Sequence, residues 1–117
     1  MGHFHDSLRQ LGSPTRELRQ HIPDTWNGFL QLAQSAVAEG AIPARIKEAF
    51  AVAIAVTDGC EACIAHHAKA AARLGTSEQE MAEALGVALL MAGGPASTMA
   101  PTAWEAFQEF REAQAAA

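Results

Sequence analysis

Residues 43–75 read PARIKEAFAVAIAVTDGCEACIAHHAKAAARLG, and this stretch predicts two helices joined by a tight turn. Pro43 suits the first position of a helix, because the N–H that proline lacks would have no partner there. The residues that follow, to about Asp58, are apolar on every side, which is typical of a central, buried helix. Gly59 breaks this helix, and a second helix is expected to run to a stop at Leu74–Gly75. We therefore expect a helix hairpin at the centre of the fold.

The flanking segments also follow helical periods, and no segment alternates as a strand would. Asp24 is expected to cap the helix before the hairpin, and Gly40 to end it. Ser77 and Glu80 predict a capping box for the helix that follows the hairpin. The run Gly93-Gly94-Pro95 is expected to end that helix.

Two further helices are expected at the ends of the chain. A short first helix should stop near Gly12 and Pro14, since both residues disfavour a helix interior. A last helix carries the aromatic residues Trp104, Phe107 and Phe110. The prediction is an all-α fold of about six helices around one hydrophobic hairpin, in a single domain over residues 1–117.

The composition favours association of subunits. Of the 117 residues, 50% are hydrophobic and only 18% are charged. A small domain buries roughly two thirds of the surface that its unfolded chain exposes. Because this chain has more apolar side chain than a lone domain of its size readily hides, we expect a homo-oligomer.

Charge and patterning exclude several partners and destinations. The net charge is −5 and the basic residues are scattered, so no nucleic-acid partner is expected. No apolar stretch reaches the ~20 residues of a membrane span. The N-terminus MGHFHD lacks the pattern of a signal peptide, and His3 and His5 in it are expected to be mobile. Two cysteines are too few for a secreted disulfide framework, so a cytoplasmic protein with a catalytic or metal-binding pair is predicted.

Both cysteines lie two residues apart at the start of the second hairpin helix. Cys60, Cys63 and His67 share one helix face, since side chains three and four residues apart are neighbours. After the turn at Gly59, the cysteines should occupy the N-terminal helical turn, where unpaired N–H groups and the helix dipole stabilise a thiolate. The pKa of a cysteine in such a place can fall from ~8.5 to ~3.5–7.5. These residues predict a redox centre.

Glu48 is the second unusual residue, because it precedes an eight-residue apolar run in the predicted central helix. A carboxylate near the core costs several kcal/mol unless it is paired or neutralised. The hairpin can bring the helix face that carries Glu48 toward the cysteine helix, although residue spacing alone does not determine how the two helices cross. Glu48 is therefore a candidate general base, and a solvated acid in a first helical turn is the alternative.

The succession of Glu48, eleven residues, Cys60-X-X-Cys63, three residues and His67 resembles the core motif of the alkylhydroperoxidase D group. That group belongs to the carboxymuconolactone decarboxylase-like superfamily. The likeness extends over residues 43–84, a little over a third of the chain, and includes the proline start, the Gly-Cys turn and the Leu-Gly stop. The combination is far more specific than a bare pair of cysteines.

The resemblance implies an all-helical fold that assembles as trimers or hexamers. It also implies an antioxidant enzyme that reduces hydroperoxides, or disulfides, without metal, haem or flavin. Cys63 would attack the peroxide and become a sulfenic acid, and Cys60 would resolve it as a disulfide. Glu48 and His67 would form a proton relay, and a thiol protein or small thiol would re-reduce the pair.

One departure and two alternatives remain. Members of the group often have histidine where this chain has Ala62, so the relay here is shorter by one imidazole. The first alternative is a lactone or decarboxylation step with Glu48 or His67 as acid or base, although the decarboxylase branch generally lacks the cysteine pair. The second is a non-catalytic assembly module whose cysteines pack together or bind zinc with His67 and either Glu48 or His66.

Overall fold

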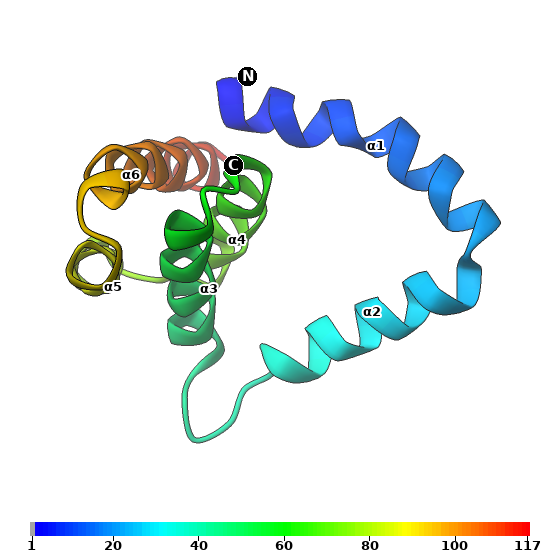
Figure 1. The fold of residues 1–117 in the computed structure, drawn as a ribbon, viewed down its shortest axis with the longest axis horizontal. Helices are drawn as coiled ribbons and strands as arrows, with labels where there is room; N and C mark the ends of the chain where they lie inside the picture. Colours follow the sequence, from blue (N-terminus) through cyan, green and yellow to red (C-terminus); the bar gives the residue numbers. More distant parts are fainter. Residues whose placement is uncertain (1) are drawn as a thin grey trace.

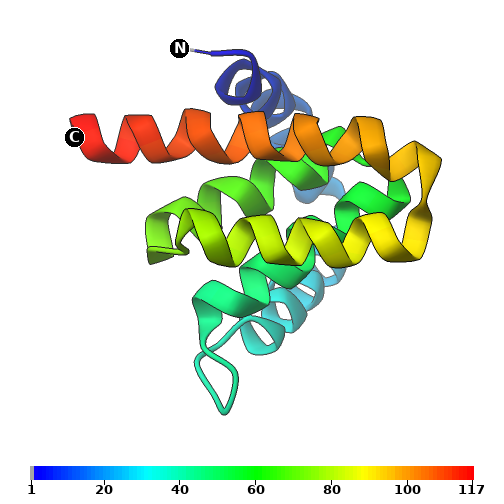
Figure 2. The same ribbon diagram turned by 90° about the vertical axis from the view of Figure 1, so that its left-hand side faces the viewer.

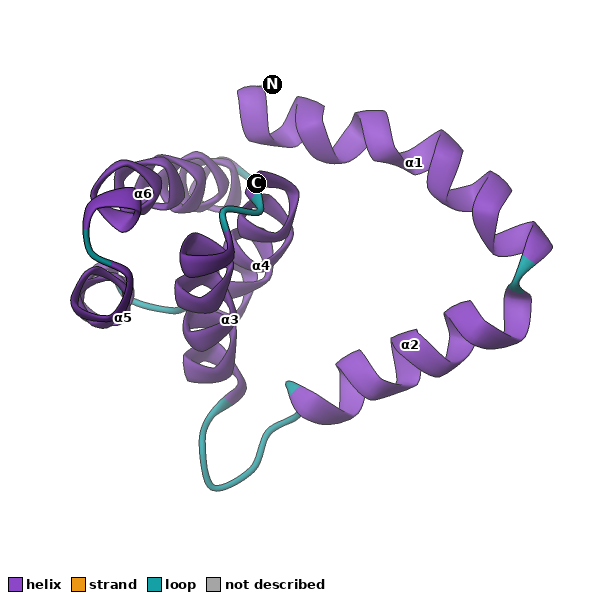
Figure 3. Cartoon of the chain, in the orientation of Figure 1, coloured by secondary structure: helices purple, strands orange, loops and turns teal. Residues whose placement is uncertain are grey.

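The computed structural model describes residues 2–117, which form six helices and no strand, so the predicted all-α class is confirmed (Figure 3). The helices are α1 (His3–His21), α2 (Pro23–Ala36), α3 (Ala44–Asp58), α4 (Glu61–Leu74), α5 (Glu78–Ala92) and α6 (Gly94–Ala116). The last four helices pack together into a body, and α3 contacts each of the other three. Figure 2 shows α5 and α6 side by side and antiparallel on one face of this body.

Small side chains let the helices of the body approach closely. Ala65, Ala68 and Ala71 on α4 are fully buried, as are Ala103 and Ala106 on α6. The distance between packed helices depends on the side chains at the contact, so alanines on both helices permit a short one. The largest fully buried side chains fill the remaining core space; they are Phe107, Ile64, Met81 and Val52.

The apolar sequence of α3 predicted a helix buried on all sides. The helix is central, but one of its faces is exposed. Its inner face buries Glu48, Ala49, Val52 and Ala55, whereas its outer face leaves Ile54 61% exposed. The body has only four helices, so one side of α3 has no neighbour to cover it. The apolar residues on that side, Ile54 among them, therefore stay exposed within the chain.

The ends of the hairpin follow the sequence closely. Gly59 and Gly75 adopt the left-handed conformation and end α3 and α4. Ser77 and Glu80 form the predicted capping box at the start of α5. Glu80 also accepts a hydrogen bond of 2.9 Å from Arg45, which ties the start of α3 to the start of α5.

The first helix is longer than predicted, because α1 continues through Pro14 to His21. Pro14 cannot donate a hydrogen bond to the carbonyl of Gln10, and its ring crowds that carbonyl. This side of α1 is exposed, so water can satisfy that carbonyl. The helix survives because the proline lies at a solvated turn.

Other predicted boundaries also shift. Helix α2 starts with Pro23 at its first position rather than with Asp24 as a side-chain cap, and it ends at Ala36, ahead of Gly40. Pro43 is the residue before α3 rather than its first residue. Gly94 does not merely follow the end of α5 but begins α6, because the proline after it suits a first helical turn.

Helices α1 and α2 form an arm that extends away from the body (Figure 1). The arm is anchored at its start, where Phe4 is buried in the core. Glu109 on α6 accepts hydrogen bonds from the backbone N–H groups of Phe4 at 3.2 Å and His5 at 2.8 Å. A carboxylate of another helix thus satisfies the free N–H groups of the first turn of α1. The expected mobile terminus at His3 and His5 is therefore wrong.

Substituting Gly59 by alanine should lower the free energy of unfolding by about 1 kcal/mol. Its φ of 70° is unfavourable for a side chain, although a Cβ would meet no atom within 4 Å. Gly86→Ala is the matched control, because Gly86 lies inside α5 with equally open surroundings and an ordinary φ. It should raise stability by about 0.5–1 kcal/mol. Denaturation by urea would measure both changes, and a neutral Gly59→Ala would contradict the account of this turn.

Candidate functional site

A disulfide joins Cys60 and Cys63 at the start of α4, and their Cα atoms are 5.2 Å apart. The left-handed Gly59 ends α3 and makes Cys60 the N-cap residue of α4. The backbone N–H of Cys63 donates to Sγ of Cys60 over 3.2 Å. The predicted position of the pair at a helical N-terminus is therefore confirmed.

The two sulfurs differ in their surroundings. Cys63 is exposed, whereas Cys60 is partly buried in the turn. An N–H donor and the positive end of the helix dipole both favour negative charge on sulfur, so the Cys60 sulfur is suited to leave as a thiolate when the disulfide is broken. Cys63 is the more exposed residue of the pair, which favours it as the cysteine that another molecule reaches.

Glu48 is 3% exposed, and its carboxylate lies against the imidazole of His67. Nδ1 of His67 is 3.1 Å from Oε1 of Glu48 and 3.3 Å from Oε2. The crossing of α3 and α4, which the spacing of residues does not determine, thus pairs two of the predicted site residues. Such a partner offsets part of the cost of burying the carboxylate.

This contact determines which nitrogen of His67 is available for proton transfer. A carboxylate accepts hydrogen bonds, so Nδ1 of His67 carries the proton that Glu48 accepts. Nε2 is then the nitrogen that remains free to accept or return a proton. Since the side chain of His67 is 30% exposed, Nε2 belongs to a group that solvent can reach.

The paired acid and imidazole lie close to the disulfide along α4. His67 follows Cys63 by four residues on the same face of this helix. Such residues have Cβ atoms about 5–6 Å apart. All four predicted site residues thus belong to one hairpin, with Cys60 joined to Cys63 and Glu48 hydrogen-bonded to His67. Within residues 2–117, no three His, Cys, Asp or Glu side chains gather as a metal-binding group.

Two histidines near the site have altered proton affinities. Desolvation lowers the pKa of His66, and the charge of a protonated His67 lowers it further; the two rings meet edge to face at 4.9 Å. On the other side of the disulfide, His3 pairs with Glu61, the residue after Cys60, and this hydrogen bond raises the pKa of His3. Sequence reasoning missed the second contact, because no local pattern connects residues 58 positions apart.

Comparison with known proteins identifies the family of this chain. The sequence model of the carboxymuconolactone decarboxylase family matches residues 23–112. An uncharacterized protein of Cupriavidus necator is 35% identical over 95 residues, which are 81% of this chain and 80% of that protein. The uncharacterized protein 4 in the cox locus of Paracoccus denitrificans is 39% identical over 70 residues, 60% of this chain and 63% of that protein.

A solved structure extends the likeness to the whole fold. The crystal structure of an apo carboxymuconolactone decarboxylase family protein from Legionella pneumophila superposes with a TM-score of 0.89 at 35% sequence identity. The alignment covers 92% of this chain and 96% of that one. With the family pattern, the fold and the residue spacing in agreement, this chain belongs to the carboxymuconolactone decarboxylase family.

Proposed function

We propose that this protein is a thiol-dependent oxidoreductase of the alkylhydroperoxidase D type, which reduces hydroperoxides or disulfides through Cys60 and Cys63. The observation that carries the proposal is the disulfide at the N-terminus of α4, one helical turn from the hydrogen-bonded Glu48 and His67. A disulfide with one exposed sulfur is chemically competent to cycle between dithiol and disulfide.

In the first step, the thiolate of Cys63 attacks the distal oxygen of a hydroperoxide. An S–O bond forms and the O–O bond breaks, which leaves Cys63 as sulfenic acid and releases an alkoxide that takes up a proton to become an alcohol. The thiol of Cys60 then attacks this sulfur, so that an S–S bond forms and water leaves. Two electrons pass from the two thiols to the peroxide.

An external thiol completes the cycle. Its thiolate attacks exposed Cys63, and the thiolate of Cys60 leaves, stabilised by the N–H of Cys63. A second external thiol group releases the donor as its own disulfide, and both cysteines regain their protons. Electrons therefore come from a thiol protein or a small thiol of a reducing compartment such as the cytoplasm, and the cycle uses no resident metal, haem or flavin.

Glu48 and His67 move protons in this scheme. Nε2 of His67 accepts the proton of the attacking thiol, directly or through water, and returns it to the departing alkoxide. Glu48 holds the imidazole in the required tautomer and stabilises its positive charge. Glu48 thus acts on the imidazole and not on the sulfur itself.

Titration of thiols before and after one equivalent of peroxide tests the reaction. The reduced protein should lose two thiols per chain, since both cysteines enter the disulfide. Cys63→Ser should abolish this loss, whereas Cys60→Ser should still consume peroxide once and leave a sulfenic acid that dimedone traps. Unchanged thiols in the wild-type protein would refute the proposal.

Turnover of a muconolactone by the Cys60→Ser, Cys63→Ser double variant would instead support the lactone or decarboxylation alternative. That chemistry needs Glu48 and His67 but no sulfur. Mass spectrometry of the native protein, with one zinc per chain and protected thiols as the signature, would identify a zinc-binding assembly module.

His67→Gln should slow the single-turnover oxidation of Cys63 by about 10²-fold at neutral pH, because it removes the group that accepts the proton. Raising the pH should recover part of the loss, since more thiolate then forms without a base. His21→Gln is the control, because His21 only contacts the carbonyl of Glu17 at the end of α1. Stopped-flow measurements across pH 5–9 give the rates, and a wild-type rate for His67→Gln would remove the histidine from the relay.

We also propose that the active form is a homo-oligomer, a trimer or hexamer, as the resemblance to the alkylhydroperoxidase D group implies. Helix α2 buries none of its residues within its own chain, and Phe29 and Leu32 are 60% and 65% exposed. The body also exposes large apolar side chains, Phe50 and Ile54 on α3 and Val87, Leu90 and Met91 on α5. Each copy of the chain carries exposed apolar side chains on both its arm and its body. The arm of one copy can therefore cover the body of the next.

Phe29→Asp should shift the protein toward the monomer, because it places a charge in the contact surface of the arm. Gln31→Asp, on the same helix, is the control and should leave the oligomer intact, since this residue is already polar and exposed. Size-exclusion chromatography with light scattering measures the mass of each variant. A wild-type monomer at tens of micromolar would contradict the assembly.

A further inference from the structure

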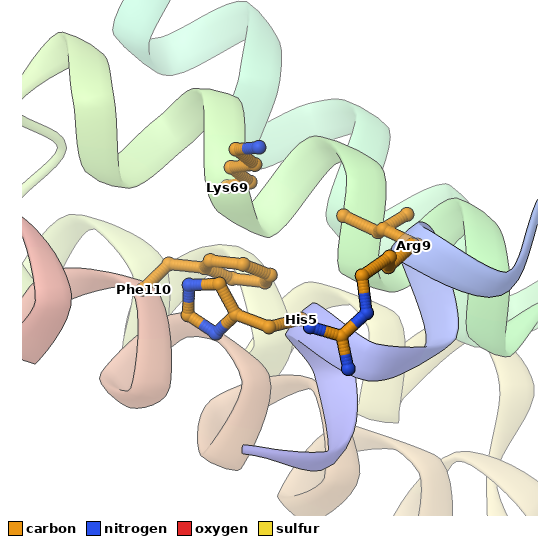
Figure 4. A pocket seen from close by; sticks show the side chains of 5 residues that line it. His5, Arg9, Lys69 and Phe110 are labelled. Atoms are coloured by element: carbon orange, nitrogen blue, oxygen red, sulfur yellow. The ribbon is translucent and has the colours of Figure 1, made fainter. Parts of the chain in front are cut away.

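A pocket of about 310 Å³ lies where the start of the arm meets the body. It is lined by His5, Leu8 and Arg9 of α1, by Lys69 of α4 and by Phe110 of α6. Figure 4 shows the rings of His5 and Phe110 beside each other on one side of the pocket, with Lys69 across from them on α4. Three separate helices thus contribute to one site.

The floor of this pocket is apolar and held in place. Phe110 is part of the buried core and Leu8 packs against that core. The ring of His5 lies 4.4 Å from the ring of Phe110, centroid to centroid. The carboxylate of Glu109 accepts a hydrogen bond from the backbone N–H of His5 and is also hydrogen-bonded to Nδ1 of its ring. These two contacts fix the position of the imidazole. The pocket thus combines two apolar side chains with the polar side chains of His5, Arg9 and Lys69, a mixture that suits an amphipathic small molecule.

One basic side chain on the rim of the pocket, Lys69, forms no ion pair within residues 2–117. Arg9 donates to Asp6 over 2.7 Å and His5 is matched by Glu109, so these two basic groups have acidic partners. The guanidinium of Arg9 has five N–H donors, of which the contact with Asp6 leaves several available. Lys69 and the remaining N–H groups of Arg9 can therefore contact one carboxylate.

We propose that this pocket binds an amphipathic monocarboxylate. The carboxylate pairs with Lys69 and Arg9, and the apolar body lies over Phe110 and Leu8. Lys69 follows His67 by two residues, about 200° around α4, so the site is separate from the thiol centre. The ligand spans α1, α4 and α6, and its binding holds the start of the arm on the body.

Titration of the full-length, disulfide-bonded protein with sodium octanoate tests this site, followed by NMR chemical shifts and calorimetry. Octanoate should saturate one site per chain and shift the amide signals of residues 5–9, 69 and 110. Acetate, which lacks the apolar body, and 1-octanol, which lacks the charge, should bind much more weakly. Hydrogen exchange of residues 5–12 should slow when octanoate is bound.

Lys69→Gln and Arg9→Gln should each weaken the binding of octanoate by about threefold to tenfold, because each removes one partner of the carboxylate. Lys47→Gln is the control, since Lys47 contacts the carbonyl of Ala38 outside the pocket. Absence of saturable binding, or equal affinity of octanoate and 1-octanol, would overturn the proposal. So would wild-type affinity in both pocket variants. The result is independent of the redox proposal, because neither cysteine takes part.

Discussion

The left-handed turn at Gly59 is the constraint on which the rest of the molecule depends. It ends α3, reverses the chain and makes Cys60 the N-cap residue of α4. The same reversal sets α3 against α4, so that a carboxylate 19 residues before His67 reaches its imidazole. One backbone conformation therefore determines both the electrostatic surroundings of the sulfurs and the pairing of the acid with the base.

Packing on either side of this turn keeps the pairing in place. The alanines of α4 bring it close to α6, while Val52 and its neighbours on α3 fill the space beneath the hairpin. Close-packed interiors resist small displacements, so the distance between Glu48 and His67 is set by the core and not by the two side chains alone. The buried carboxylate needs such rigidity, since its loss of hydration is offset only while the imidazole stays within hydrogen-bond range.

Local signals in the sequence predicted the helices of the body well. Glycine at a helix end, a serine three residues before a glutamate and the periodic spacing of apolar residues each act within a few positions of the chain. They correctly placed the turn at Gly59, the end of α4 and the capping box at Ser77. The cysteines were predicted at the helix N-terminus by the same kind of signal, because Gly59 directly before them ends the preceding helix.

Features that depend on distant parts of the chain were not predictable in this way. The contact of Glu48 with His67 requires a crossing angle, which residue spacing does not contain. The continuation of α1 through Pro14 depends on how exposed that turn is, and the anchoring of Phe4 depends on a carboxylate at residue 109. The open outer face of α3 likewise follows from the number of helices around it and not from its own composition.

The cap that Glu109 provides for α1 has a consequence for how the chain acquires its structure during synthesis. Helix α1 leaves the ribosome before α6, the helix whose carboxylate accepts the N–H groups at the start of α1. The start of α1 therefore lacks this cap until α6 has been synthesised. A nascent product that stops before α6 cannot form the cap.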